Sequence, residues 1–265
     1  MRILIVGDVV GRPGRHAFKN FTQKIRQDRK IDVVIVNGEN AAHGKGLTKN
    51  TFNELLSSGA DIVTSGNHIW DKSDVLAIID QEPFLIRPAN YPDAPGRGFC
   101  VYPFQSKDIC VVNIAGRAFM QPIDCPFRTV ETIIREVKDS SDIIIVDFHA
   151  ETTSEKMAMG FFLDGLHKEL GANINLMFGT HTHVQTADDR ILTNGTGYIT
   201  DIGMVGVRDS VIGVAVQSSL DRFLTGRLTR FEVAEGSCIY CAMILEIDDS
   251  TNKTLSLERI FLNED

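Results

Sequence analysis

The chain has 265 residues, of which 43% are hydrophobic and 23% are charged, and its formal net charge is −8 at pH 7. This composition is typical of a globular protein with a substantial apolar core. The acidic balance, without any cluster of lysine and arginine, excludes tight binding to a long nucleic-acid duplex. The chain also lacks a secretory signal and any uncharged apolar run of about 18 residues, the length of a membrane helix. We therefore expect a cytoplasmic protein without a membrane segment.

The first third of the chain predicts three buried strands separated by two helices. The strands are predicted by apolar runs at 3–7, 32–38 and 61–67. Pro13 opens the first predicted helix, and Thr48 can cap the second. This β-α-β-α-β order predicts a mainly parallel sheet with helices on both of its faces.

The rest of the chain alternates in a similar way. The Pro/Gly-rich stretch 87–98 predicts an irregular loop, and the runs at 98–104 and 108–116 predict a hairpin. Helical spacing then alternates with apolar runs, so we expect helices at 127–137 and 154–170 and strands at 142–150 and 174–178. From residue 190 onward, short strand-like runs dominate. The five cysteines are an odd number set among apolar neighbours, which predicts buried thiols rather than metal ligands.

Polar side chains follow each of the predicted parallel strands. The set consists of Asp8, Glu39, Asn40, Asn67, His68, His149, His181 and His183. The carboxyl ends of parallel strands form the edge at which open α/β sheets bind ligands. Imidazole nitrogens mixed with carboxylate and amide oxygens suit Mn, Fe or Zn.

Simpler explanations exist for these residues when each is taken alone. Asp8 could cap the segment that follows it, Asn67 and His68 could form a turn, and His149 could be a satisfied core histidine. The run Gly-Thr-His-Thr-His at 179–183 is more specific, because one intervening residue lets both imidazoles reach a common cleft. Their joint occurrence at strand ends favours one shared site, since buried polar groups need partners.

The order of these motifs resembles that of the calcineurin-like metallophosphoesterases. The matching blocks are Gly-Asp at 7–8, Gly-Glu-Asn at 38–40, Gly-Asn-His at 66–68, the lone His149 and the run at 179–183. Longer runs are similar to the YmdB-like phosphodiesterases over nearly the whole chain: GDVVGRPGR, NGENAAHGKGLT, SGNHIWD, RPANYP, DFHAETTSEK, TDIGM and RFEVAEG. The resemblance implies an α/β fold of the metallophosphoesterase type. That fold is a four-layer sandwich of two mixed β-sheets flanked by helices, here as a single domain over residues 1–265.

The resemblance also implies a binuclear metal site, with Fe or Mn expected and Zn or Mg as alternatives. By motif, the ligands of the first metal are Asp8, Asn40 and His183. Those of the second metal are Asn67, His149 and His181. Glu39 bridges the two ions. His68 is not a ligand in this scheme, and its expected role is to stabilise phosphoryl charge or to protonate the leaving oxygen.

Three positions depart from the general superfamily pattern. Val10 stands where a histidine ligand is usual, Glu39 replaces the usual bridging aspartate, and Thr180 replaces the first histidine of the last block. The first metal therefore lacks one imidazole, and the carboxamide oxygen of Asn40 could take its place. Alternatively, Asn40 could hydrogen-bond a metal-bound water from outside the ligand set.

The implied activity is hydrolysis of 2',3'-cyclic nucleotides and simple phosphodiesters by a hydroxide held between metals about 3.5–4 Å apart. We expect little base preference, because no aromatic cluster near the motifs marks a base pocket. The main alternative is a metal-bound regulator or scaffold with little activity, and homo-oligomerisation stays open. A nucleotide-binding dehydrogenase fits poorly, because GDVVGRPG lacks the G-x-G-x-x-G spacing.

Overall fold

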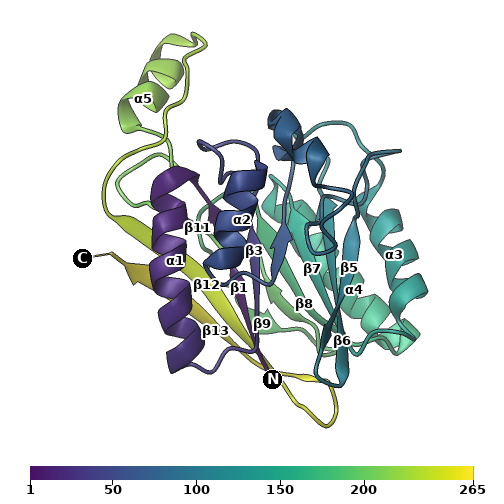
Figure 1. Ribbon diagram of the computed structural model, residues 1–265. Coiled ribbons are helices and arrows are strands. Elements are labelled where there is room, and N and C mark those ends of the chain that lie inside the picture. Colours follow the sequence, from purple (N-terminus) through teal and green to yellow (C-terminus); the bar gives the residue numbers. More distant parts are fainter. Residues whose placement is uncertain (265) are drawn as a thin grey trace.

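The computed structural model describes residues 1–264 and contains two β-sheets that lie face to face between two layers of helices (Figure 1). The first sheet has the order β2-β11-β12-β1-β3-β4, and β13 pairs with β12 outside that path. Its strands are β1 (Arg2–Val6), β2 (Asp8–Val9), β3 (Val33–Asn37), β4 (Ile62–Thr64), β11 (Met204–Val207), β12 (Cys238–Ile247) and β13 (Thr254–Asn263).

The second sheet has the order β5-β6-β7-β8-β10-β9. Its strands are β5 (Phe99–Phe104), β6 (Lys107–Ala115), β7 (Ile143–His149), β8 (Ile174–Thr180), β9 (Arg190–Ile191) and β10 (Gly197–Ile199). The predicted hairpin is confirmed, because β5 and β6 pair antiparallel. β6, β7 and β8 run parallel, as do β1, β3 and β4 in the first sheet. Both sheets are therefore mixed, as the family resemblance implies.

Alternate residues of each central strand pack into different layers. In β1, Ile3 and Ile5 face the second sheet, whereas Leu4 and Val6 face the helices. The same alternation occurs in β7, because Ile145 joins the core between the sheets and Val146 joins the core beneath the helices. Both faces of each sheet are buried in this way, which explains why the strands are continuous apolar runs.

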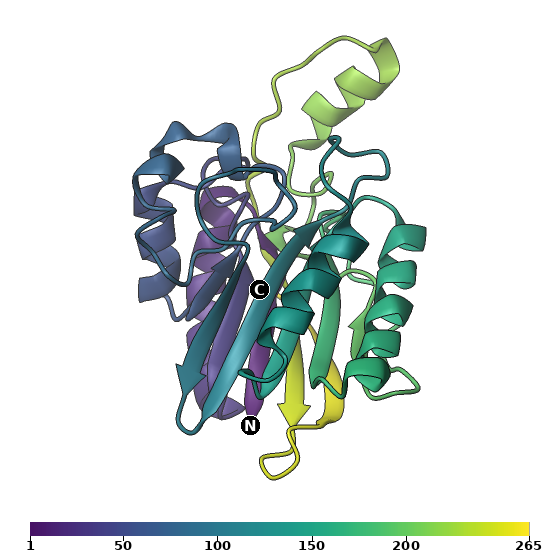
Figure 2. The ribbon, with the colours of Figure 1, turned by 90° about the vertical axis from the view of Figure 1, so that its right-hand side faces the viewer.

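The outer layers are formed by two helices on each sheet (Figure 2). The helices α1 (Gly11–Asp28) and α2 (Lys49–Ser57) cover the first sheet, and α3 (Pro126–Val137) and α4 (Thr153–Leu170) cover the second. The predicted four-layer sandwich is confirmed. The prediction of one sheet with helices on both faces is wrong, because continuous apolar strands reveal that both faces are covered but not whether a helix or another sheet covers them.

The local signals for these helices are largely confirmed. Thr48 caps α2 in a capping box, in which its hydroxyl accepts a hydrogen bond from the Thr51 backbone N–H at 3.3 Å. Two short 3-10 helices, η1 (Ile69–Asp71) and η2 (Ser73–Ala77), follow β4. None of the helices in residues 1–264 is both long and apolar enough to cross a membrane. All five cysteines are free thiols, and four are buried while Cys125 is half-buried.

Strands dominate after residue 190, as expected, but the helix α5 (Val216–Thr225) among them is not predicted by the sequence. It projects beyond the sandwich at the top of Figure 1. The β-branched run that precedes it favours a strand, but Gly213, at a φ of +96°, folds that run into a turn. Val211 and Val214 exchange two backbone hydrogen bonds across this turn, and the helix starts directly after it.

Candidate metal centre

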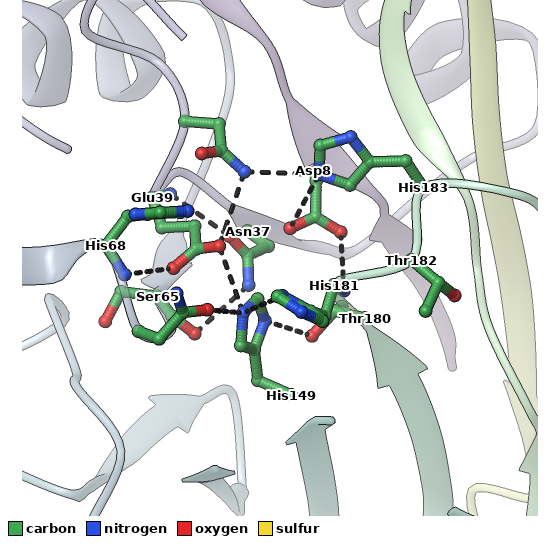
Figure 3. A network of polar contacts seen from close by, with 12 residues as sticks. Asp8, Asn37, Glu39, Ser65, His68, His149, Thr180, His181, Thr182 and His183 are labelled. Atoms are coloured by element: carbon green, nitrogen blue, oxygen red, sulfur yellow. Dashed lines mark hydrogen bonds and ion pairs between the residues drawn. The ribbon is translucent and has the colours of Figure 1, made fainter. Parts of the chain in front are cut away.

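The polar residues predicted at the strand ends come from both sheets and meet at one edge of the sandwich. Asp8 begins β2, and Glu39 and Asn67 follow β3 and β4 in the first sheet. His149 ends β7, and His181 directly follows β8 in the second sheet. Because the parallel strands of both sheets end here, residues far apart in the sequence surround one buried volume (Figure 3).

Four of these side chains direct nitrogen or oxygen atoms at one point. The Nε2 atom of His149 lies 3.0 Å from Glu39 Oε1, 2.8 Å from Asn67 Oδ1 and 3.1 Å from His181 Nδ1. Ligand atoms of Glu39, His149 and His181 all lie within 4.8 Å of one another. A single N–H of His149 cannot serve all three neighbours, whereas a cation among them would be coordinated by every one. This donor set therefore fits a metal ion.

A second group lies beside the first and contains Asp8, Asn40 and His183. Asp8 is fully buried, and its Oδ1 has no hydrogen-bond partner among the described residues. His183 Nε2 lies 3.8 Å from this oxygen and 3.2 Å from Asn40 Nδ2. A buried carboxylate oxygen without a partner is costly, and a cation at this point would remove the cost. Rotation of the Asn40 carboxamide by 180° would exchange its nitrogen for its oxygen at the same place.

The electrostatics of the first group also favour a cation. Burial disfavours the ionised form of Glu39, but His149 and His68 outweigh it and lower the pKa of Glu39 to about 2. Burial likewise opposes a charge on His149, yet Glu39 and Asp8 raise its pKa to about 9. Burial and the neighbouring His149 lower the pKa of His181 to about 3. Without a metal, His149 therefore stays protonated near neutral pH. A metal ion bound at this point would displace that proton.

Each histidine is oriented by an acceptor on the side away from the site. His149 Nδ1 lies 2.9 Å from Thr180 Oγ1, and that hydroxyl donates to Asp147 Oδ1 at 2.7 Å. His181 Nε2 lies 3.0 Å from Glu151 Oε2. Such outer partners fix the tautomer and the direction of a metal-binding imidazole. Thr180 and the two acids were not predicted as site residues, although both acids lie two positions from His149 in the motif DFHAE.

His183 is oriented by the backbone, because its Nδ1 lies 2.8 Å from the carbonyl oxygen of Ile212. That carbonyl belongs to the turn before α5, which thereby contacts the candidate centre. The sequence offers no signal for this contact, since it depends on how the α5 segment returns to the sandwich.

The loop that carries His181 and His183 has an unusual backbone. Their φ angles are +94° and +65°, in the left-handed region that non-glycine residues rarely occupy. Thr182 between them donates to Asp201 Oδ2 through its backbone N at 3.2 Å and its hydroxyl at 2.6 Å. Lys156 Nζ contacts the same oxygen at 2.7 Å, and both charged side chains are buried. A buried ion pair thus holds the loop in place.

The structure explains why the first residue of the Gly-Asn-His motif, Gly66, is a glycine. A Cβ atom at this position would lie 2.3 Å from His149 Nε2 and 2.5 Å from Glu39 Oε2. Any side chain here would therefore displace two of the converging donors.

His68 lies beside this group rather than in it. Its backbone N–H donates to Glu39 Oε2 at 2.8 Å, and its Nδ1 lies 3.0 Å from Asp71 Oδ2. The carboxylate of Asp71 thereby orients the ring. His68 lines a cavity of about 510 Å³ together with Glu39, Asn40, His181 and His183. The same cavity has a basic part, formed by His43, Lys45, Lys72 and Arg230.

A smaller cavity of about 350 Å³ lies against the same centre. It is lined by Asn67, His181, Phe119, Met120 and Gln121. His181 therefore borders both cavities.

Comparisons with known proteins agree over the whole chain. Residues 4–260 match the family described as YmdB-like protein. A Bacillus subtilis (strain 168) protein named 2',3'-cyclic-nucleotide 2'-phosphodiesterase is 46% identical over 266 residues, which cover 100% of this chain and 98% of that protein. The crystal structure of a hypothetical protein from Thermus thermophilus is 39% identical with a TM-score of 0.92, and the match covers 100% of both chains. The crystal structure of a novel phosphatase from Mycoplasma pneumoniae is 36% identical with a TM-score of 0.93, covering 100% of this chain and 94% of that chain.

Proposed function

The chain belongs to the YmdB-like protein family, and from this membership we propose that it is a metal-dependent phosphodiesterase acting on 2',3'-cyclic nucleotides and simple phosphodiesters. The observation that carries the proposal is the convergence of Glu39, His149 and His181 at the edge where both sheets end. The substrate class comes from the Bacillus subtilis relative, whose name specifies a 2',3'-cyclic nucleotide and its 2' ester bond.

The two groups of donors divide between two cations. Asp8, Asn40 and His183 would hold one, Asn67, His149 and His181 the other, and Glu39 would bridge them. The mixed nitrogen and oxygen donors favour Fe or Mn over a thiolate-binding metal. When bound, the ions would supply an activated water and neutralise phosphoryl charge.

His68 is the group that we assign to the leaving oxygen. The water oxygen forms a bond to phosphorus and gives up a proton to solvent, and the bond between phosphorus and O2' breaks. O2' takes a proton from His68 Nε2, and His68 regains a proton from solvent. The product is a nucleoside 3'-monophosphate. Asp71 supports this role because it holds Nδ1 and directs the opposite nitrogen away from itself.

The basic part of the larger cavity attracts the anionic substrate. Lys45, Lys72 and Arg230 line it, and within residues 1–264 none of the three has a carboxylate at salt-bridge distance. Glu39, Glu151 and Glu232 line the same cavity, so we expect these cations to act by contacting the phosphate ester directly rather than through a net positive charge of the cleft.

The test uses protein purified without chelator and supplied with Mn²⁺. We expect turnover of adenosine 2',3'-cyclic phosphate and of bis-p-nitrophenyl phosphate, its loss on chelation and its return with metal. His149→Ala should lose metal and activity together, while His167→Ala, on the outer helix α4, should retain both. Hydrolysis of phosphomonoesters only would refute the proposal. Full metal occupancy without turnover of either diester would support a regulator or scaffold instead.

A further inference from the structure

Phe119 combines two features that a folded protein normally avoids. Its side chain leaves 93% of its surface exposed to solvent. Its backbone has a φ of +59°, in the left-handed region that bulky residues rarely occupy. Strain of this kind persists where the surrounding structure enforces it, and it clusters at ligand-binding sites.

The loop that presents the ring is anchored to the candidate metal centre. It follows β6, and the backbone N–H of Gly116 donates to the carbonyl oxygen of His149 at 2.9 Å. Glu155, in the first turn of α4, accepts hydrogen bonds from the backbone N–H groups of Arg117 and Ala118, each at 3.2 Å. The aromatic ring is therefore held on a fixed support.

The ring of Phe119 lies beside the candidate metal centre, where the phosphate of a substrate would react. Phe119 lines the cavity of about 350 Å³ that also contains Asn67 and His181. The loop after β6 stands at the end of the molecule where β7 and β8 finish (Figure 2). A phosphate held at Asn67 and His181 would thus place the attached nucleoside beside the ring.

We propose that Phe119 is the platform on which the base of a nucleotide substrate stacks, an inference that rests on the proposed phosphodiesterase function. A phenyl ring offers a π-face but no hydrogen bond, so it stacks with every base and distinguishes none strongly. Phe119 therefore favours nucleotides over other phosphodiesters, while base preference stays weak.

Phe231 is another aromatic side chain that lines a cavity at the site, and it is less suited to this role. It lines the larger cavity, but the guanidinium of Arg222 lies 4.9 Å from its ring centroid and the ammonium of Lys45 lies 6.0 Å away. Cations already occupy the approach to this ring. Phe119 has no such neighbour among the described residues.

The kinetic test compares a cyclic phosphate with and without a base. Adenosine 2',3'-cyclic phosphate and glycerol 1,2-cyclic phosphate share the five-membered ring, and only the first can stack. Phe119→Ala should lower kcat/KM for the nucleotide about 5- to 150-fold and leave the value for the glycerol ester unchanged. Phe119→Tyr should retain the wild-type ratio. Phe223→Ala removes a phenylalanine that is 79% exposed on α5 and should change neither value.

A binding measurement gives a second readout. Calorimetry should show that Phe119→Ala weakens binding of adenosine 3'-monophosphate by a similar factor and leaves binding of inorganic phosphate unchanged. Equal losses for the substrates with and without a base, or no loss for the nucleotide, would overturn the proposal. If the wild-type protein cleaves neither cyclic phosphate, the proposed function fails, and the binding comparison still decides the role of Phe119.

Discussion

Replacing Lys156 with methionine tests whether the buried ion pair beneath the histidine loop maintains both the fold and the site. The Lys156 side chain is 1% exposed, and that of Asp201 is fully buried. Methionine keeps the length of the apolar stem but removes the cation. Asp201 would retain hydrogen bonds from the backbone N–H and the hydroxyl of Thr182 and from the backbone N–H of Gly203. The negative charge of Asp201 would, however, be buried without a counter-ion.

The size of the effect follows from this geometry. Removing one partner of a buried pair costs about 3–5 kcal/mol. The three remaining hydrogen bonds stabilise the carboxylate, so we expect the lower end, about 3 kcal/mol. Near this chain length, 1 kcal/mol shifts the Tm by about 2–4 °C, which predicts a fall of about 6–12 °C. Turnover should fall as well, because Asp201 holds the loop that carries His181 and His183.

The assay is differential scanning calorimetry at fixed protein and metal concentrations. Lys138→Met is the matched control, because its partner Asp139 is 85% exposed and such a pair contributes about 0–1 kcal/mol. Asp201→Asn in the Lys156→Met background removes the stranded charge and keeps an acceptor for Thr182. We expect this double variant to be more stable than Lys156→Met alone. An unchanged Tm in Lys156→Met, or no recovery in the double variant, would refute the reasoning.

Three further predictions concern the candidate centre, and elemental analysis combined with kinetics checks each of them. His68→Ala should keep both metals and lower turnover about 10²–10⁴-fold, whereas metal lost in step with activity would identify a ligand. Gly66→Ala should lose metal and activity, because its Cβ would lie 2.3 Å from a converging nitrogen. Gly165→Ala, which meets nothing within 4 Å, should keep both and gain about 0.5–1 kcal/mol of stability. Asn40→Ala should lower occupancy of the first metal more than the second, and Glu39→Ala should empty both. A metal-loaded structure with Asn40 turned away from both ions would contradict its assignment.

Strand direction explains why the sequence could predict the neighbourhood of the site. A buried apolar run followed by a polar residue marks a carboxyl end, and parallel strands bring such ends together. This rule predicts Asp8, Glu39, Asn67, His149 and His181 at strand ends that share one edge. In the structure these strand ends come from two sheets and still meet at that edge. The rule requires only the direction of each strand, and apolar runs reveal that direction when helices connect them.

The same signals could not reveal what depends on three-dimensional packing. Apolar alternation does not distinguish a covering helix from a covering sheet, so the second sheet had to come from the family resemblance. The partners that orient the histidines could not be identified either. Glu151 and Thr180 lie in the motifs, but their spacing does not show which histidine each one contacts. The sequence does not predict the turn around Gly213 or the helix after it, because the β-branched run at this point favours a strand.

The local structure of the histidine loop differs from the one that the spacing of its residues predicts. The spacing of His181 and His183 suggested that both rings would leave a strand end on the same side. Instead β8 ends at Thr180, and both histidines adopt left-handed backbone angles that cost about 1–3 kcal/mol each. This conformation directs His181 Nδ1 toward His149 and His183 Nε2 toward Asp8. The hydrogen bonds of Thr182 with Asp201 offset that cost. Stability and ligand geometry therefore depend on the same buried carboxylate, which is why losing its partner lysine should lower both.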